Sequence, residues 1–307
     1  MTSESTYRTL HDDLVEARVL VPAGVDGLYG RSKAFEAVAS GVMAVVSRWG
    51  DELGVEHLHF PPVVARATFE RTNYVESFPD LMGSIHVFRG DDREHAELLR
   101  RLAGDKDWPE LLEPAETVLA SATCHPVYPL CTGRVGAEGR RFGVLGYCFR
   151  HEPSIDPARM QSFRMQEVVY VGDAAGAAAH REEGLRFGMG MLEELGLEMT
   201  AVVASDPFFG RAGRVLASGQ RDQELKIEGV TPIASREHPT AIMSANRHLD
   251  HFGEAFAIET PDGSVAESAC VAFGIERITL ALFRRHGLDP ETWPDQVVGR
   301  LGLSGRP

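Results

Sequence analysis

The chain has 307 residues, 43% hydrophobic and 25% charged, which is ordinary for a soluble globular protein with one large or two modest domains. It has no apolar run near the roughly 18 residues of a membrane span, and its N-terminus lacks the basic-then-apolar pattern of a secretory signal. A net charge of −14 argues against nucleic-acid binding, which usually needs a basic surface. We therefore expect a cytoplasmic protein that does not bind membranes.

The first half of the chain begins with residues 1–30, which we predict to be a short, irregular extension. From Ser32 onward, apolar residues recur at spacings of three and four, which predicts a helix with Ser32 as its N-cap and Gly54 just past its end. A short strand, VEHLHFPP, follows. Residues 63–113 are predicted to form helices and loops.

The second half of the chain contains most of the predicted strands. They cover residues 116–122, 141–152, 163–172, 198–205, 222–230 and 253–260. A helix is predicted over 174–196, and the last clear element is a helix from Gly274 to Gly287. Because strands dominate without regular βαβ alternation, we predict an α+β fold with a mainly antiparallel sheet flanked by helices.

One motif with chemical meaning is FRHE at the end of a predicted strand, followed by a loop arginine and a second strand. Period-two alternation predicts that Arg150 and Glu152 share a face of the strand. An arginine fork matches a phosphate, and the ring of Phe163 on the second strand can stack on a base, with Arg159 in the loop between. The alternative is a surface hairpin with an ordinary ion pair between Arg150 and Glu152.

A second motif, AFGIER, stands at the start of an apolar helix. A helix N-terminus favours anions, and Arg277 can bind a terminal phosphate. The alternative is an ordinary helix start with an exposed pair between Glu276 and Arg277.

In this order and at this distance, the two motifs resemble motifs 2 and 3 of class II aminoacyl-tRNA synthetases. The helix from Ser32 and the strand ending at Pro62 resemble motif 1, which builds the dimer interface in that family. The resemblance implies a homodimer whose catalytic domain covers residues 31–307, with a helical insertion around 63–113. One departure is that the family's glycine-rich run in motif 3 is reduced here to Gly274.

The resemblance also implies roles for individual residues. Catalytic roles fall to Arg150, Glu152 and Arg277, and an ATP site with Mg²⁺ would be formed by these together with Arg159, Phe163 and Ser244. Asp206, Asn246 and Glu167 would face the amino-acid substrate. The alternative for Asp206 is an ordinary turn residue ahead of Pro207.

A narrower resemblance is to zinc-dependent seryl-tRNA synthetases and to the amino acid:[carrier protein] ligases derived from them. It is carried by Cys124, Glu167 and Cys270, because residues of these types at matching places hold a zinc ion in those families. Three protein ligands leave one position for the substrate's α-amine. Without the resemblance, isolated cysteines are more often buried apolar residues. Cys131 is the rival for the first ligand, and Cys148 is predicted to lie in the core.

The implied function is ATP-dependent activation of glycine, alanine or serine as an adenylate, followed by transfer to the phosphopantetheine thiol of a carrier protein. No tRNA is expected, because the chain has little before motif 1 and nothing basic in its place. The alternatives are a trimmed seryl-type synthetase and a non-catalytic regulatory paralogue. Two basic groups could dock an acidic carrier, although each can equally be a solvated helix face: Arg93, Arg100 and Arg101, or Arg211, Arg214 and Arg221.

Overall fold

The computed structural model describes residues 3–104, 106–206, 209 and 217–303. At its centre is a seven-stranded sheet of order β10-β11-β12-β14-β9-β8-β3, in which every neighbouring pair is antiparallel except β3 with β8. Its strands are β3 (Glu56–His59), β8 (Arg140–Phe149), β9 (Ser162–Gly172), β10 (Thr200–Ala204), β11 (Lys226–Thr231), β12 (Thr240–Leu249) and β14 (Glu267–Gly274). The prediction of a mainly antiparallel α+β fold is confirmed.

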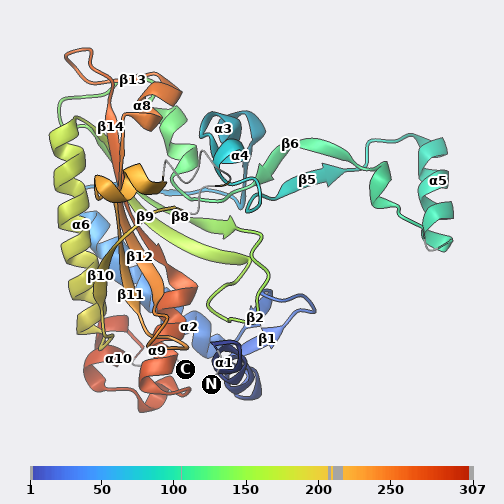
Figure 1. Ribbon diagram of the computed structural model, residues 1–307, viewed down its shortest axis with the longest axis horizontal. Coiled ribbons are helices and arrows are strands. Elements are labelled where there is room, and N and C mark those ends of the chain that lie inside the picture. The colour runs from blue at the N-terminus through green and yellow to red at the C-terminus, as the bar shows by residue number, and fades with distance from the viewer. Residues whose placement is uncertain (1–2, 105, 207–208, 210–216, 304–307) are drawn as a thin grey trace.

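Several helices lie against this sheet, and one stands apart from it at the far end of an arm (Figure 1). The longer helices are α1 (Ser3–Glu16), α2 (Lys33–Glu52), α5 (Asp92–Ala103), α6 (Ala174–Glu194) and α9 (Ile275–His286). The shorter ones are α3 (Arg66–Arg71), α4 (Tyr74–Ser77), α8 (His251–Phe256), α10 (Asp295–Leu301) and the 3-10 turns η1 (Pro109–Leu111), η2 (His125–Cys131) and η3 (Pro290–Thr292). The remaining strands are β1 (Leu20–Pro22), β2 (Tyr29–Arg31), β4 (Val63–Ala65), β5 (Ser84–Val87), β6 (Glu113–Leu119), β7 (Gly133–Arg134) and β13 (Ile258–Glu259).

Helix α2 begins and ends where the sequence predicts. The Ser32 hydroxyl accepts a hydrogen bond from the backbone N–H of Phe35 at 3.1 Å, which caps the helix. Gly54 follows the last turn with φ of +65°, a conformation that glycine adopts without strain. The apolar face of α2 packs with the sheet residues Val168 and Val271 in the main core. One face of the sheet is therefore covered by helix, and the functional residues described below lie on its other face.

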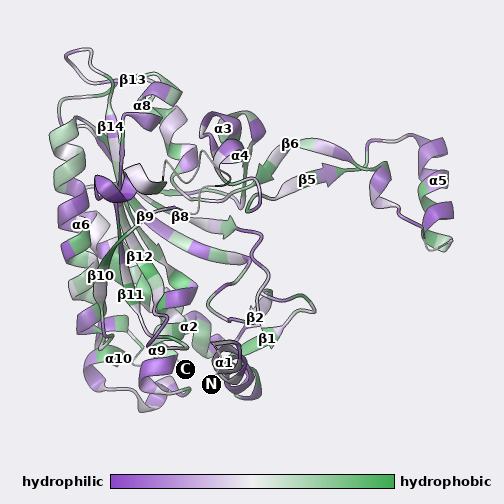
Figure 2. Ribbon diagram, in the orientation of Figure 1, coloured by the Kyte–Doolittle hydropathy of each residue, from purple (hydrophilic) through white to green (hydrophobic). Residues whose placement is uncertain are grey.

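An arm extends from the body of the molecule and carries α5 at its far end (Figure 1). Strands β4, β6 and β5 form a three-stranded sheet from which the arm projects. The prediction of only helices and loops over residues 63–113 is therefore wrong in part. Helix α5 has no buried residue and is largely hydrophilic in Figure 2, unlike the strands of the central sheet. Its capping box, Asp91 with Glu94, explains why it forms without a core behind it.

Three further expectations about secondary structure are wrong. The first thirty residues are not irregular, because α1 packs Leu10 and Leu14 into the main core. The strand predicted over 253–260 is wrong in part: its first half is the end of α8, where Phe252 and Phe256 lie one turn apart and are both buried, and only Ile258–Glu259 is a strand, β13. Helix α10 follows α9, so α9 is not the last element. The division of the chain at residue 30 stays a prediction.

No helix within the described ranges is both long and apolar enough to span a bilayer.

Candidate active site and metal centre

The open face of the central sheet carries a row of polar side chains brought together by strand register. Glu167 on β9 lies opposite Ala272 on β14, and Ser244 on β12 lies opposite the same alanine. Cys270 pairs with Asn246 in the same way, two residues along each strand. Because side chains alternate between faces, all four polar residues point to one side. They line a cavity of about 620 Å³.

The cavity contains nearly all of the residues expected at the site. Its lining includes Cys124, Arg150, Glu152, Phe163, Glu167, Asp206, Ser244, Asn246, Cys270 and Arg277. Arg159 is the exception among the predicted site residues, as it does not line the cavity and its side chain is 51% exposed. Arg211 and Arg214 lie outside the described residues, and Arg221 donates to the Ser205 hydroxyl at 2.6 Å.

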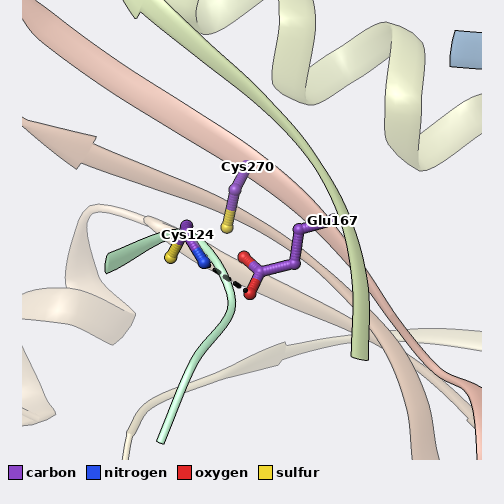
Figure 3. A group of neighbouring side chains, drawn as sticks. All are labelled: Cys124, Glu167 and Cys270. Atoms are coloured by element: carbon purple, nitrogen blue, oxygen red, sulfur yellow. Dashed lines mark hydrogen bonds between the residues drawn. The ribbon is translucent and has the colours of Figure 1, made fainter. Parts of the chain in front are cut away.

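In the wall of the cavity, Cys124, Glu167 and Cys270 form a buried group whose ligand atoms all lie within 4.8 Å of one another. They come from the start of η2, from β9 and from β14, and Figure 3 shows the Cys270 sulfur pointing toward the carboxylate. Cys131, the rival for the first position, is buried away from this group, where Arg140 approaches its sulfur at 4.0 Å. Cys148 is a buried core residue, as predicted.

The Glu167 carboxylate is oriented by three hydrogen bonds to one of its oxygens. Oε1 accepts from the Thr123 N–H at 2.8 Å, from the Thr123 hydroxyl at 2.7 Å and from the Cys124 N–H at 3.2 Å. Oε2 is thereby left for the sulfurs. Two thiols and a carboxylate are ligand types that zinc prefers, and three protein ligands leave one coordination position open. The buried group of residues therefore fits the metal.

The two thiols in this group are held in their protonated form by their surroundings. The hydrogen bond with Cys270 and then burial raise the pKa of Cys124 well above its ordinary value. For Cys270, the hydrogen bond with Cys124 acts in the opposite direction and lowers the pKa. Burial and the nearby Glu167 carboxylate outweigh this effect, so the pKa of Cys270 is also raised. A bound cation reverses such shifts, since a coordinated thiol loses its proton.

Two arginines, Arg150 and Arg277, bring positive charge to the wall of the cavity. Arg277 donates to the backbone oxygens of Ala158 at 2.8 Å and Ala241 at 3.0 Å, which fixes its guanidinium. Burial and the nearby charge of Arg150 lower the pKa of Arg277. Two half-buried like charges near each other are unfavourable unless an anion neutralises them, so this part of the cavity is suited to phosphate.

The motif around Arg150 differs in detail from expectation. Strand β8 ends at Phe149, opposite Ser162, so Arg150 and Glu152 lie beyond the strand and alternation does not place them. The ion pair between Arg150 and Glu152, which belonged to the alternative of an ordinary surface hairpin, does not form, because Glu152 accepts from Arg159 at 3.0 Å instead. The Arg150 guanidinium lies 5.7 Å from the ring centre of Phe163, so that the cation and the ring face the cavity together.

Asp206 takes part in a charged cluster that the sequence analysis did not identify. It forms an ion pair with Lys226 and accepts from the Gln220 amide at 2.9 Å, while Lys226 also lies 3.3 Å from Glu228. Burial alone would raise the pKa of Asp206, but Lys226 and Gln220 lower it. Burial would likewise lower the pKa of Lys226, and Asp206 and Glu228 raise it. The period-two spacing of lysine and glutamate in ELKIEGV was the signal for two of these residues.

A histidine cluster lines the cavity beside the metal-ligand group and was also missed. His125, His248 and His251 all line the cavity, whereas His151 is exposed. Burial lowers the pKa of His125 to about 3 and that of His248 to about 4, so both are neutral at pH 7.

The fold and the site together define a class II aminoacyl-tRNA synthetase-like catalytic core. Among solved structures, seryl-tRNA synthetase from Methanopyrus kandleri, in complex with an A. aeolicus tRNASec, has a TM-score of 0.82 at 23% identity over 96% of this chain and 60% of that one. Seryl-tRNA synthetase from Pyrococcus horikoshii with ATP has a TM-score of 0.68 at 13% identity, over 95% of this chain and 62% of that one.

Sequence relatives narrow the class to a family. Amino acid–[acyl-carrier-protein] ligases 1 and 2 of Bradyrhizobium diazoefficiens are 40% and 42% identical over 91% and 92% of this chain, and 86% and 84% of their own lengths. The type-2 serine–tRNA ligase of Methanopyrus kandleri is 29% identical over 87% of the chain, which spans only 54% of that relative. No protein-family model matches. The chain belongs to the family of amino acid–[acyl-carrier-protein] ligases.

Proposed function

We propose that this ligase activates a small amino acid with ATP and transfers it to the phosphopantetheine thiol of a carrier protein. The observation that carries the proposal is the single cavity that holds both the Cys124, Glu167 and Cys270 group and the two arginines Arg150 and Arg277. The relatives named amino acid–[acyl-carrier-protein] ligases supply the substrate and partner classes.

The first step is formation of an aminoacyl-adenylate. A carboxylate oxygen of the amino acid attacks the α-phosphorus of ATP, and pyrophosphate leaves. Arg150 and Arg277 neutralise the charge on the phosphates together with Mg²⁺, and Phe163 offers its ring to the base. Arg159, which is exposed and paired with Glu152, can close over the nucleotide from the rim. When bound, zinc at the cysteine group supplies a Lewis acid that takes the substrate's α-amine.

The second step is transfer. The sulfur of the phosphopantetheine thiol, after losing its proton, attacks the carbonyl carbon of the adenylate, and AMP leaves with the electron pair of the broken carbon–oxygen bond. The protein contributes by holding the two reacting groups close together. Asp206, through its pairs with Lys226 and Gln220, helps to shape the wall of the substrate pocket.

The pocket beside the cysteine group favours small amino acids. Ala122 and Ala272 line it there, and Ala272 lies directly opposite Glu167 in the sheet. The charged pair of Asp206 with Lys226 borders the same space and offers little apolar surface. We propose glycine, alanine or serine, with modest selection among them, because one methylene is worth only about 1–3 kcal/mol.

The arm offers a docking surface for the carrier. Arg100 at the end of α5 is 74% exposed, although it is paired with Glu97, and Arg101 is 25% exposed. Beside these arginines, Leu99 and Leu102 are exposed without covering partners in the body. The end of α5 therefore carries exposed leucines and arginines around its circumference, which can contact a small acidic protein, so we propose that the carrier docks on α5. We also propose that the enzyme acts as a homodimer through α2 and does not use tRNA.

The test is amino-acid-dependent exchange of pyrophosphate into ATP, followed by carrier acylation. Glycine, alanine and serine are each tried with and without a zinc chelator. We expect exchange that the chelator abolishes and zinc restores, and transfer to a phosphopantetheinylated carrier but not to tRNA. Charging of tRNA would identify a trimmed synthetase instead. Absence of exchange with every amino acid would indicate a regulatory protein.

A further inference from the structure

Two side-chain nitrogens lie within hydrogen-bonding distance of the Cys270 sulfur, and this sets it apart from the sulfur of Cys124. Asn246 Nδ2 lies 3.3 Å from Cys270 Sγ, and His248 Nε2 lies 3.6 Å from the same sulfur. Both distances are within the range of hydrogen bonds to sulfur, which is a larger acceptor than oxygen. Among the described residues, the hydrogen bonds include no N–H donor to Cys124 Sγ.

The geometry of the sheet explains the first of these contacts. Asn246 on β12 is the register partner of Cys270 on β14, so the two side chains stand next to each other on the cavity face. The Asn246 amide also donates to the Ser244 hydroxyl at 3.0 Å. Both hydrogens of its NH₂ group are thus used, one on Ser244 and one on the sulfur.

The second contact depends on how the imidazole of His248 is held. Its Nδ1 lies 3.0 Å from the Ser268 hydroxyl, which can donate a hydrogen bond to it. The ring packs edge-on against Phe252 with centres 5.0 Å apart, and against Tyr128 with centres 6.4 Å apart. If Nδ1 accepts from Ser268, the hydrogen of the neutral ring is on Nε2, which faces Cys270.

We propose that Asn246 and His248 are positioning residues that donate two N–H···S hydrogen bonds to the Cys270 thiolate and so raise the affinity of the site for zinc. The inference rests on the proposed function, because it takes the cysteine group to be a zinc site. A thiolate can only accept hydrogen bonds, so these donors favour the metal-bound form of Cys270. Groups that orient metal ligands in this way commonly change metal affinity about 10–100-fold.

The two donors also make the two sulfur ligands unequal. Hydrogen bonds withdraw electron density from a thiolate, so Cys270 would donate less charge to the metal than Cys124 does. The metal would then keep more positive charge for the substrate's amine. On this view Asn246 acts through Cys270, whereas the sequence analysis expected it to contact the substrate directly.

The experiment removes each donor without changing the shape of the site. Asn246→Leu and His248→Phe keep the volume and delete the N–H. Zinc affinity is measured by competition with a chromogenic chelator, and the cobalt-substituted proteins are examined by absorption. We expect zinc binding to weaken about 10–100-fold in the double variant. We also expect the sulfur-to-cobalt charge-transfer band to move to lower energy, because a thiolate without N–H donors gives up its electrons more readily.

Controls separate this role from a general loss of packing. His180→Phe makes the same exchange at a buried histidine that stacks near Trp49 and donates to the Val168 carbonyl, and it should leave zinc affinity and the cobalt band unchanged. Ser268→Ala removes only the hydroxyl that holds Nδ1 of His248, and it should move the cobalt band in the same direction by a smaller amount. This smaller change also serves as the test if a larger variant fails to fold.

The outcomes distinguish the inference from the function on which it rests. Folded variants with wild-type zinc affinity and an unmoved cobalt band would overturn the inference alone. A wild-type protein that binds no zinc would overturn both.

Discussion

The cavity and the arm use charge in opposite ways. In the cavity, each charged group is fixed by several elements: Asp206 by Lys226 and Gln220, Arg277 by two backbone oxygens. On the arm, α5 buries no residue; Arg100 and Arg101 pair with the nearby Glu97 and Glu110, and Arg101 also donates to the backbone oxygen of Asp107. The difference indicates that the cavity is preorganised for chemistry, whereas the arm presents a surface that can change without disturbing the fold.

The largest effect that this comparison predicts is in the cavity. Arg277→Ala should lower amino-acid-dependent exchange about 10²–10³-fold, as removal of a fixed charge donor to a transition state commonly does. Arg277→Lys should recover little, because one ammonium cannot both replace a fork held by two carbonyl oxygens and bind a phosphate in the proposed way. The measurement is steady-state exchange with saturating amino acid.

The matched control for this variant is Arg141→Ala. Arg141 lies over the ring of Tyr170 and does not line the cavity, so exchange should stay near the wild-type rate. If both variants lost exchange equally, the loss at Arg277 would reflect folding and the preorganised cavity would lose its main support.

A smaller and more selective effect is expected on the arm. Arg100→Glu with Arg101→Glu should lower transfer to the carrier about tenfold, since reversing charges on a docking surface mainly slows association. Exchange should be unchanged, because α5 lies at the end of the arm, away from the body that holds the cavity (Figure 1). The measurement compares carrier acylation with exchange in one preparation at two salt concentrations.

Arg134→Glu provides the control for charge reversal. Arg134 is 61% exposed on β7, in the body rather than on the arm, and pairs with Glu259 at 3.3 Å. Transfer should be unaffected by this change. Equal loss of exchange and transfer in the arm variant would show that the two regions are not independent, and the proposed docking surface would be abandoned.

Parts of the site that are local in sequence could be predicted from it, whereas parts assembled from distant strands could not. The motifs around Arg150 and Arg277 are local, and the residues of each motif meet in the structure because strand, loop and helix follow one another in the chain. The Cys124, Glu167 and Cys270 group has no local signal at all. It was reached only through resemblance to a family, and it assembles because β9 and β14 are neighbours in the sheet.

Helix α1 could have been predicted from the sequence and was not. Tyr7, Leu10 and Leu14 are spaced by three and four, which was the signal for α1. By contrast, the pair of Asp206 with Lys226 joins residues separated by a long connection, and no periodicity indicates it. The arm was also unpredictable in shape, since its short strands β4 and β5 carry little alternation and depend on pairing with β6.

The smallest effect expected concerns stability and pH, and it tests whether the charges of the cavity are fixed before substrate binds. The pKa of Asp206 in the folded protein is lowered from an ordinary value of 3.8, because Lys226 and Gln220 outweigh the effect of burial. A carboxyl with a lowered pKa stabilises the fold above its unfolded pKa, and the contribution is lost as pH falls through the folded pKa. Asp206→Asn should therefore lower Tm at pH 7 by about 2 °C, which corresponds to about 1 kcal/mol in a domain of this size.

This difference in Tm between wild type and Asp206→Asn should shrink progressively below about pH 4, where the wild-type carboxyl also becomes neutral. The pKa of Lys226 is raised, so its charge is retained throughout this range and cannot cause the change. Glu116→Gln, which removes an exposed carboxylate 3.7 Å from Arg66 on the arm side, should have no measurable effect at either pH. A Tm difference that persists at low pH would mean that Asp206 acts through shape and hydrogen bonding alone. Only the arginines of the cavity would then support the contrast between a cavity whose charges are fixed before substrate binds and an arm whose charges are not.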